Sequence, residues 1–264
     1  MNIIHKISIK AKPEIRELLK KLGIEVLDGP FLDFKIEESN KNWEKLEPKL
    51  KEWDVLDMVN TTFSLKELSE SVWLVMLPDW HHGYPQPEDD FEYMSSTYDS
   101  SNYCSKCGIG AVQKESFRML KEPKWGKRGI LQLNWVFDEF FVLPEVWREV
   151  FKMFDIQSLP VIHHRTGKNL NTVLQISNLE EVELIDIDTY PYELCNDCGR
   201  KKYLPITRGR FPKTRTIPKS HIARTKEYFG SGGSAFNEVL VSQELYKRIV
   251  EYKLKGVSFK AIHQ

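Results

Sequence analysis

The chain contains two copies of one short motif, Cys104-Ser105-Lys106-Cys107-Gly108 and Cys195-Asn196-Asp197-Cys198-Gly199. All four cysteines of the protein lie in these two motifs. A Cys-x-x-Cys-Gly turn directs two thiolates toward one point, and its glycine lets the backbone turn tightly behind the second sulfur. Two such turns supply the four ligands of a closed tetrahedral zinc site, which leaves no position open for substrate. The pair therefore predicts one structural Zn²⁺ bound by Cys104, Cys107, Cys195 and Cys198.

Two other interpretations of the motifs remain open. A thioredoxin-like redox site uses a single reactive Cys-x-x-Cys that follows a strand and opens a helix. Here the motif is doubled, and a glycine, which is a poor helix starter, follows each copy. Two disulfides would require an oxidising compartment, and the sequence shows no export signal. Zinc binding is the interpretation that the doubled spacing favours.

Composition sets broad limits. The chain of 264 residues is long enough for one large domain or two smaller ones, and its Lys plus Arg and Asp plus Glu totals are both 38. This balance gives no overall charge that would favour nucleic acid or membrane. Residues 1–6 lack the apolar stretch of a signal peptide, and the longest apolar run, residues 72–77, is too short to span a bilayer. We expect a soluble cytoplasmic protein.

The first 63 residues predict a βαββαβ unit of the ferredoxin-like kind. Ile7 and Ile9 alternate with polar residues as in a half-buried strand, and Pro13 fits the first position of a helix that stops at Gly23. That fold hosts many unrelated functions and so identifies none. The remaining elements expected here are strands at 24–27, 31–36 and 55–63 and a helix at 43–53.

The sequence changes character after residue 77. Ser64 to Glu67 form a capping box for a short helix, and the apolar run 72–77 is typical of a buried strand. Residues 78–103 then form a long loop rich in proline and acidic residues. We place the domain boundary there, with an N-terminal ferredoxin-like domain at 1–77 and a zinc-binding domain at 78–264.

The second domain is predicted to be α+β and zinc-ribbon-like, with a long insertion between the two cysteine motifs. The segment 109–194 far exceeds a simple ribbon loop, so metal binding would join distant parts of the chain. Pro144 can begin a helix, and Ser242 is a plausible N-cap for a helix that ends before Gly256. The strand candidates are 130–137, 140–143, 161–162, 173–176, 182–187, 239–241 and 257–259.

Residues 200–226 carry ten Lys or Arg and no acidic residue. Tyr203, Phe211 and His221 interleave with these cations, so the segment could bind nucleic acid through phosphate contacts and base stacking. It could equally be a solvated loop that pairs with the acidic segments 88–92 or 180–188. The neutral total charge favours internal pairing.

Several other candidates have simpler explanations. His81-His82 and His163-His164 are adjacent pairs, and adjacent side chains on a strand point to opposite faces, which disfavours a shared metal. Asp138-Glu139 could serve acid–base chemistry but has no companion motif. The glycine–serine run 230–234 lacks the Gly-Lys-Ser/Thr ending of a phosphate loop, and no nucleophile elbow surrounds Ser242. Nothing in the sequence argues for an enzyme.

The two cysteine motifs, with Arg200 after the second, resemble those of the bacterial double-CXXCG-motif proteins. The ending is also similar to that family, with Val-Ser-Gln-Glu-Leu at 241–245, a helix, and Gly-Val-Ser-Phe at 256–259. The resemblance covers roughly residues 100–264. The family includes immunity proteins encoded beside toxins, so the resemblance implies a binding protein that neutralises a cognate toxin without catalysis. It carries over the four cysteines and identifies no residue that contacts a toxin.

These observations lead to two hypotheses. The first is a non-enzymatic, zinc-stabilised binding protein of the immunity type, with the acidic loop 88–92 or the basic segment 200–226 as the partner surface. The alternative is a nucleic-acid-binding zinc-ribbon protein that uses the basic segment. An enzyme would require a pocket with convergent polar groups near His81, His163 or Asp138.

Overall fold

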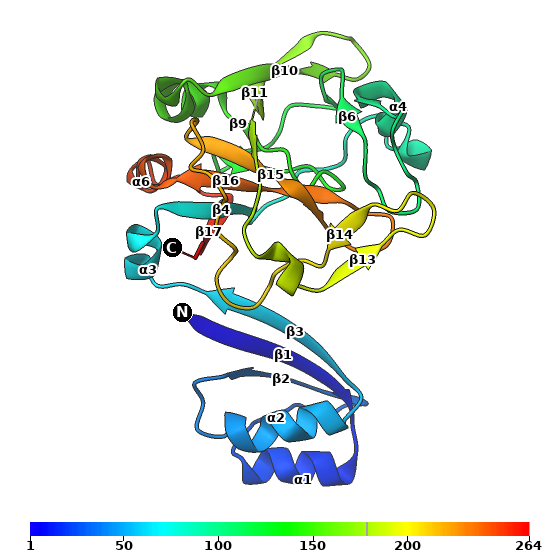
Figure 1. Cartoon of the computed structure of the whole chain (residues 1–264), viewed down its shortest axis with the longest axis vertical. Coiled ribbons are helices and arrows are strands. Elements are labelled where there is room, and N and C mark those ends of the chain that lie inside the picture. The colour runs from blue at the N-terminus through cyan, green and yellow to red at the C-terminus, as the bar shows by residue number, and fades with distance from the viewer. Residues whose placement is uncertain (178, 264) are drawn as a thin grey trace. The chain divides into compact units, whose positions relative to one another are not determined.

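The computed structural model describes residues 1–177 and 179–263, and the chain forms two compact units (Figure 1). The first unit comprises Met1–Glu67 and Ile206–Arg210, and the second comprises Leu68–Pro205 and Phe211–Gln264. Strands outnumber helices in the described residues, which confirms the predicted α+β class. The units divide at residue 67 instead of after residue 77, because strand β4 (Trp73–Pro78) pairs with two strands near the C-terminus.

The first unit is a three-stranded antiparallel sheet covered on one face by two helices (Figure 1). Its strand order is β2-β1-β3, so the central strand pairs with both others. Alternate residues of β1 and β2, such as Ile7 and Phe34, are buried against the helices, as the period of two predicts. The elements are β1 (Asn2–Lys10), α1 (Pro13–Lys21), β2 (Phe31–Glu37), α2 (Trp43–Glu52) and β3 (Val55–Thr62).

The strand predicted at residues 24–27 is wrong, and the end of α1 explains why. Gly23 adopts a φ of 69° and donates its N–H to the carbonyl of Lys20, while the N–H of Ile24 bonds the carbonyl of Leu19. This is the bond pattern of a Schellman cap. Ile24 and Val26 then pack against the apolar core without pairing with a strand. The observed order is therefore βαβαβ.

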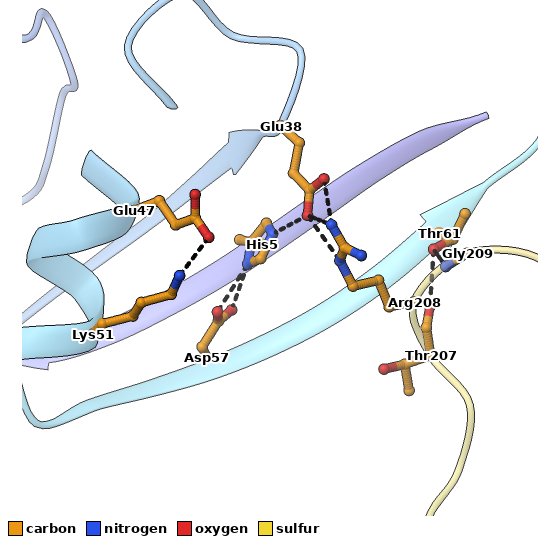
Figure 2. Close-up of polar contacts among 9 residues, drawn as sticks. All are labelled: His5, Glu38, Glu47, Lys51, Asp57, Thr61, Thr207, Arg208 and Gly209. Atoms are coloured by element: carbon orange, nitrogen blue, oxygen red, sulfur yellow. Dashed lines mark hydrogen bonds and ion pairs between the residues drawn. The ribbon is translucent and has the colours of Figure 1, made fainter. Parts of the chain in front are cut away.

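A short segment from late in the sequence belongs to the first unit (Figure 2). The guanidinium of Arg208 donates two hydrogen bonds of 2.9 Å to both carboxylate oxygens of Glu38. Thr61 donates its hydroxyl to the carbonyl of Thr207 at 2.9 Å and accepts the N–H of Gly209 at 2.8 Å. These contacts hold residues 206–210 against the ends of β2 and β3.

His5 joins this network from the central strand (Figure 2). Its ring is buried, with Nδ1 2.8 Å from a carboxylate oxygen of Asp57 and Nε2 3.1 Å from Glu38. Burial opposes ionisation of Glu38, but the hydrogen bonds from His5 and Arg208 outweigh it and lower the pKa of that carboxyl. The first unit thus contains, besides its apolar core, a polar cluster formed by His5, Glu38, Asp57 and Arg208.

The second unit contains two larger sheets and one two-stranded ribbon. In the largest sheet β4 lies between β16 and β17, which places residues 73–78 beside the C-terminal part of the chain. Its strands are β13 (Tyr192–Leu194), β14 (Lys201–Tyr203), β15 (Ile222–Phe229), β16 (Phe236–Ser242), β4, β17 (Val257–Ala261) and β12 (Glu180–Val182), which pairs with β15.

The second sheet of this unit has the order β7-β10-β11-β9-β8, and its strands are short except for the β10–β11 hairpin. A ribbon of β5 and β6 flanks the first cysteine motif. These strands are β7 (Arg118–Met119), β10 (Gln157–His163), β11 (Asn169–Ser177), β9 (Phe141–Val142), β8 (Ile130–Leu131), β5 (Tyr98–Asp99) and β6 (Val112–Gln113).

The remaining helices are short, and the first of them, α3, begins within the first unit. Ser64 and Glu67 exchange the bonds of the predicted capping box at the start of α3, and the hydroxyl of Ser242 caps α6 by accepting the N–H of Leu245 at 3.2 Å. Both caps are confirmed. The helical elements are α3 (Leu65–Glu70), η1 (Asp89–Phe91), α4 (Tyr93–Thr97), α5 (Pro144–Val146), the π-helical turn η2 (Trp147–Phe151), η3 (Lys152–Phe154), η4 (Ile187–Thr189) and α6 (Gln243–Glu251).

Two predicted strands are shorter than expected, for one physical reason. The strand at 130–137 is limited to β8, and of the strand predicted at 182–187 only Val182 belongs to a strand, as the last residue of β12. Trp135 and Asp186 have φ values of 67° and 54°, and this left-handed conformation ends an extended run. No helix in the described part of the chain is both apolar enough and long enough to cross a bilayer.

Candidate metal centre

The two cysteine motifs form turns of the same backbone design, each at the tip of a two-stranded hairpin. The first, residues 104–108, is the first knuckle, and it lies between β5 and β6. The second, residues 195–199, is the second knuckle, and it lies between β13 and β14. In both, the N–H of the glycine bonds the carbonyl of the first cysteine at 2.8 Å. In both, the N–H of the first cysteine bonds the carbonyl five residues later, at Ile109 or Arg200.

The four sulfurs lie close together, although the two knuckles are 91 residues apart in sequence. The Sγ atoms of Cys104 and Cys195 are 3.7 Å apart, as are those of Cys107 and Cys198, and all four lie within 4.8 Å of one another. A disulfide needs about 2 Å, so these are four free thiols. A tetrahedron with Zn–S bonds of about 2.3 Å has edges of about 3.8 Å, which matches the shorter separations.

The donor set therefore fits a tetrahedral thiolate site. Cys107 is buried, Cys104 and Cys195 are partly buried, and Cys198 is exposed. Four sulfurs complete the shell, and such a site holds structure without offering an open position for chemistry. Within the described residues these cysteines are the one group of three or more metal-binding side chains arranged in this way.

Gly108 shows why a glycine follows the first knuckle. Its φ is 80°, and a Cβ at this position would lie 2.4 Å from the carbonyl oxygen of Gly233. A side chain would push the knuckle away from the glycine–serine loop at 230–234. Gly199 also has a positive φ, of 71°, but a Cβ there would meet no atom within 4 Å. The first glycine is thus required by both packing and conformation, and the second by conformation alone.

Two cations that follow the second knuckle hold the backbone around the first. Lys202 is 1% exposed, and its Nζ donates to the carbonyls of Cys107, Gly232 and Ser234 at 2.9, 2.5 and 2.9 Å. Arg200 donates through Nη1 to the carbonyl of Ile109 at 2.8 Å. The first knuckle is therefore held by hydrogen bonds from residues that follow the second knuckle.

The thiols of the first knuckle differ in acidity in the metal-free chain. Backbone N–H groups of Cys107 and Lys106 lower the pKa of Cys104 to about 7, whereas burial raises the pKa of Cys107 to about 12. A bound metal ion deprotonates a coordinating thiol outright. Because its pKa is the higher of the two, the Cys107 thiol is the one whose ionisation would depend more on a bound metal ion.

The basic segment 200–226 is largely paired inside the protein. Besides Lys202 and Arg200, Lys201 contacts Asp188 at 2.6 Å, and Arg215 and Lys226 share Glu183. The predicted pairing with the acidic segment 180–188 is confirmed. Nucleic-acid binding stays an untested prediction, and the cations available for phosphate contacts are fewer than the sequence indicates.

The histidine pairs lie apart from the cysteine cluster. His81 forms a bridge with Gln132, and burial lowers the pKa of His82. His163 accepts the N–H of Arg165 through Nδ1 at 3.2 Å, and Nδ1 of His164 is buried without a hydrogen-bond partner in the described residues. Neither pair is part of a group that could hold a metal.

Asp138 and Glu139 lie instead at a second polar site with a partner that sequence reasoning missed. Glu139 accepts a hydrogen bond from Arg224 at 3.1 Å and another from Gln175 at 2.9 Å. Arg224 is one of the ten Lys or Arg residues of the basic segment, and the sequence alone does not distinguish it from the other nine. Its half-buried position on β15 and its ion pair with Glu139 distinguish it only in the folded chain.

The chain matches no protein-family model, and no curated protein or solved structure is similar to it. The geometry of the two knuckles and the resemblance of their motifs therefore carry the functional interpretation.

Proposed function

We propose that this protein is a non-enzymatic, zinc-stabilised binding protein that acts as an immunity protein against a cognate bacterial toxin. The observation that carries the first half is the convergence of four thiols from two hairpin tips within 4.8 Å. The second half comes from the resemblance of the knuckles and the C-terminal segment to the double-CXXCG-motif proteins.

The proposed metal role is structural. Zn²⁺ bound by Cys104, Cys107, Cys195 and Cys198 would cross-link the β5–β6 and β13–β14 hairpins in a zinc-ribbon-like arrangement. Metal analysis of the purified native protein should find one zinc per chain, and Cys107→Ser should lower that content. Four free thiols without metal in the native protein would contradict the proposal.

The proposed partner surface is the acidic loop at 88–92. In the described part of the chain Asp89, Asp90 and Glu92 are exposed and have no ion-pair partner. In the basic segment, by contrast, ion pairs are formed by Lys201, Arg208, Arg215, Arg224 and Lys226. Exposed Phe91 adds an apolar contact within the same loop. An unpaired acidic surface favours a basic partner, because opposite charge accelerates association.

Co-expression tests the toxin role. The chain should restore growth to cells that express the toxin encoded beside its gene. The double charge reversal Asp89→Lys with Asp90→Lys should abolish protection, and Lys213→Glu with Lys219→Glu in the basic segment is the matched control. Loss of protection only in the Lys213→Glu, Lys219→Glu variant would assign the toxin-binding surface to the basic segment instead. Failure to bind the product of any neighbouring gene would refute the immunity role.

A further inference from the structure

The second unit contains a cavity of about 590 Å³ beside the first knuckle. Its volume lies in the range of small-molecule sites, which is about 300–1,000 Å³. Gly108 and Gly110 of the knuckle region and Ser234 of the glycine–serine loop form part of its wall. The aromatic side chains that line it include Phe91, Tyr93, Tyr98, Trp135, Phe137 and Tyr228.

One wall of this cavity is a cluster of rings around Trp135. The ring centroids of Phe91 and Trp135 are 4.4 Å apart, and Tyr93 lies nearly parallel to Trp135 at 6.1 Å. Phe91 and Trp135 have positive φ values of 59° and 67°. Bulky residues rarely adopt this conformation, and each costs on the order of 1–3 kcal/mol, a strain that proteins concentrate at functional sites. The backbone is thus strained at both residues that present this wall.

The cavity also contains an excess of acidic groups. Asp138, Glu139 and Glu181 line it together with one cation, Arg224. Arg224 pairs with Glu139, with 3.1 Å between Nη2 and Oε1, and its buried Nε atom has no hydrogen-bond partner among the described residues. The carboxylate of Asp138 accepts the N–H of Asn237 at 3.3 Å, which leaves it with capacity for further donors.

Burial favours the neutral forms of Asp138 and Glu139. It raises the pKa of Asp138, and it raises the pKa of Glu139 to about 7 even though Arg224 opposes the shift. A cation placed beside them would restore their ionised forms. An anion would meet three carboxyl groups and a single guanidinium, one nitrogen of which is bonded to Glu139.

We propose that this cavity is a binding site for a small organic cation with a flat apolar body, such as an arylalkylamine. Its ammonium group would donate to Asp138, and its ring would lie against the Trp135 wall. Aromatic faces and carboxylates are the two protein groups that attract organic cations. The site goes beyond the proposed immunity function and does not depend on it.

Titration of the zinc-loaded full-length chain with tryptamine tests the site by calorimetry and by tryptophan fluorescence. Tryptophol carries a hydroxyl in place of the amine, and indole-3-propionate carries a carboxylate on the same ring. We expect tryptamine to bind at least about tenfold more tightly than tryptophol, and indole-3-propionate not to bind. Equal affinity for tryptamine and tryptophol would refute recognition of the cation. No binding of tryptamine at about 1 mM would refute the site.

Three variants assign the residues. Asp138→Asn should weaken tryptamine binding about tenfold and leave tryptophol binding unchanged. Glu181→Gln, at an exposed position that folding tolerates, should weaken it about twofold by lowering the local charge. Glu145→Gln removes an exposed acid that does not line the cavity and should leave the affinity unchanged. Unchanged affinity in both Asp138→Asn and Glu181→Gln, with native hydrogen exchange, would overturn the assignment.

Discussion

The two units of this protein reach stability by different means. The first contains no cysteine, and its core comes from alternating apolar residues of a small sheet packed against two amphipathic helices. The second places four thiols, a buried lysine and several buried acids within a larger aromatic fold. Apolar contacts tolerate changes of solution conditions, whereas metal ligands and buried charges respond to chelators and pH. The stability of the second unit should therefore depend more strongly on chelators and pH than the stability of the first unit.

Metal removal should have the largest effect on the difference in stability between the two units. Chelation should unfold the second unit, because structural zinc contributes on the order of 10 kcal/mol in small metal sites. The first unit should keep its protection. Hydrogen exchange followed by peptide mass spectrometry would measure residues 1–62 and 192–242 separately. Cys107→Ser should reproduce the effect, and Ser105→Ala in the same knuckle is the control. Equal loss of protection in both units would contradict their independence.

Substitution of the buried Lys202 should have the next largest effect on stability. Lys202→Met leaves three carbonyls without their donor and should lower the free energy of unfolding by about 3 kcal/mol. Lys201→Met is the matched control, since the Lys201 side chain is 36% exposed and forms an ion pair with the more exposed Asp188. Urea denaturation of the zinc-loaded chain measures both. Similar midpoints for the two variants would show that Lys202 does not hold the first knuckle.

The buried acid Glu238 predicts that the stability of the second unit depends on pH between about 4.5 and 7. Burial raises its pKa from 4.5 to about 7, although Lys260 opposes the shift and Asp138 adds to it. A folded carboxyl with a raised pKa stabilises the protein below its unfolded value and loses that contribution as pH rises toward 7. Glu238→Gln should therefore stabilise the protein above pH 7 by on the order of 2 kcal/mol.

Urea midpoints across this pH range, with zinc in excess, measure the effect. The difference between Glu238→Gln and the unmodified chain should grow from pH 4.5 to 7 and then level off. A difference that does not change with pH would mean that Glu238 has the same pKa in the folded and the unfolded chain.

The smallest effect concerns the segment at 206–210. Arg208→Ala removes the two-point contact with Glu38 and should cost the first unit about 1 kcal/mol, a value reduced by the 64% exposure of the arginine side chain. Glu47→Gln is the control, because its exposed pair with Lys51 contributes less than about 0.5 kcal/mol (Figure 2). Hydrogen exchange at residues 206–210 should rise only in Arg208→Ala. Equal rates in both variants would mean that Arg208 does not hold the segment.

Prediction from sequence succeeded where the signal was local. Pro13 and Gly23 bound the first helix, Ser64 and Ser242 cap theirs, and the four cysteines converge as their spacing indicated. The strand at 24–27 failed because the N–H of Ile24 closes the helix end instead of joining a sheet. Alternation of apolar residues alone does not reveal that competing bond.

The amino-acid sequence by itself determined which residues can bind a metal, because ligand chemistry and the tight cysteine–glycine turn are properties of a few neighbouring residues. Only the tertiary structure decided that Lys202 lies beneath the first knuckle and that Arg224 faces Glu139. These partners are 95 and 85 residues apart in sequence. A lysine in a basic segment carries no local mark of burial, since burial depends on which distant strands pair around it. The four cysteines that could bind a metal ion are therefore identifiable from the motifs alone, whereas the burial of Lys202 is set by the sheets that enclose it.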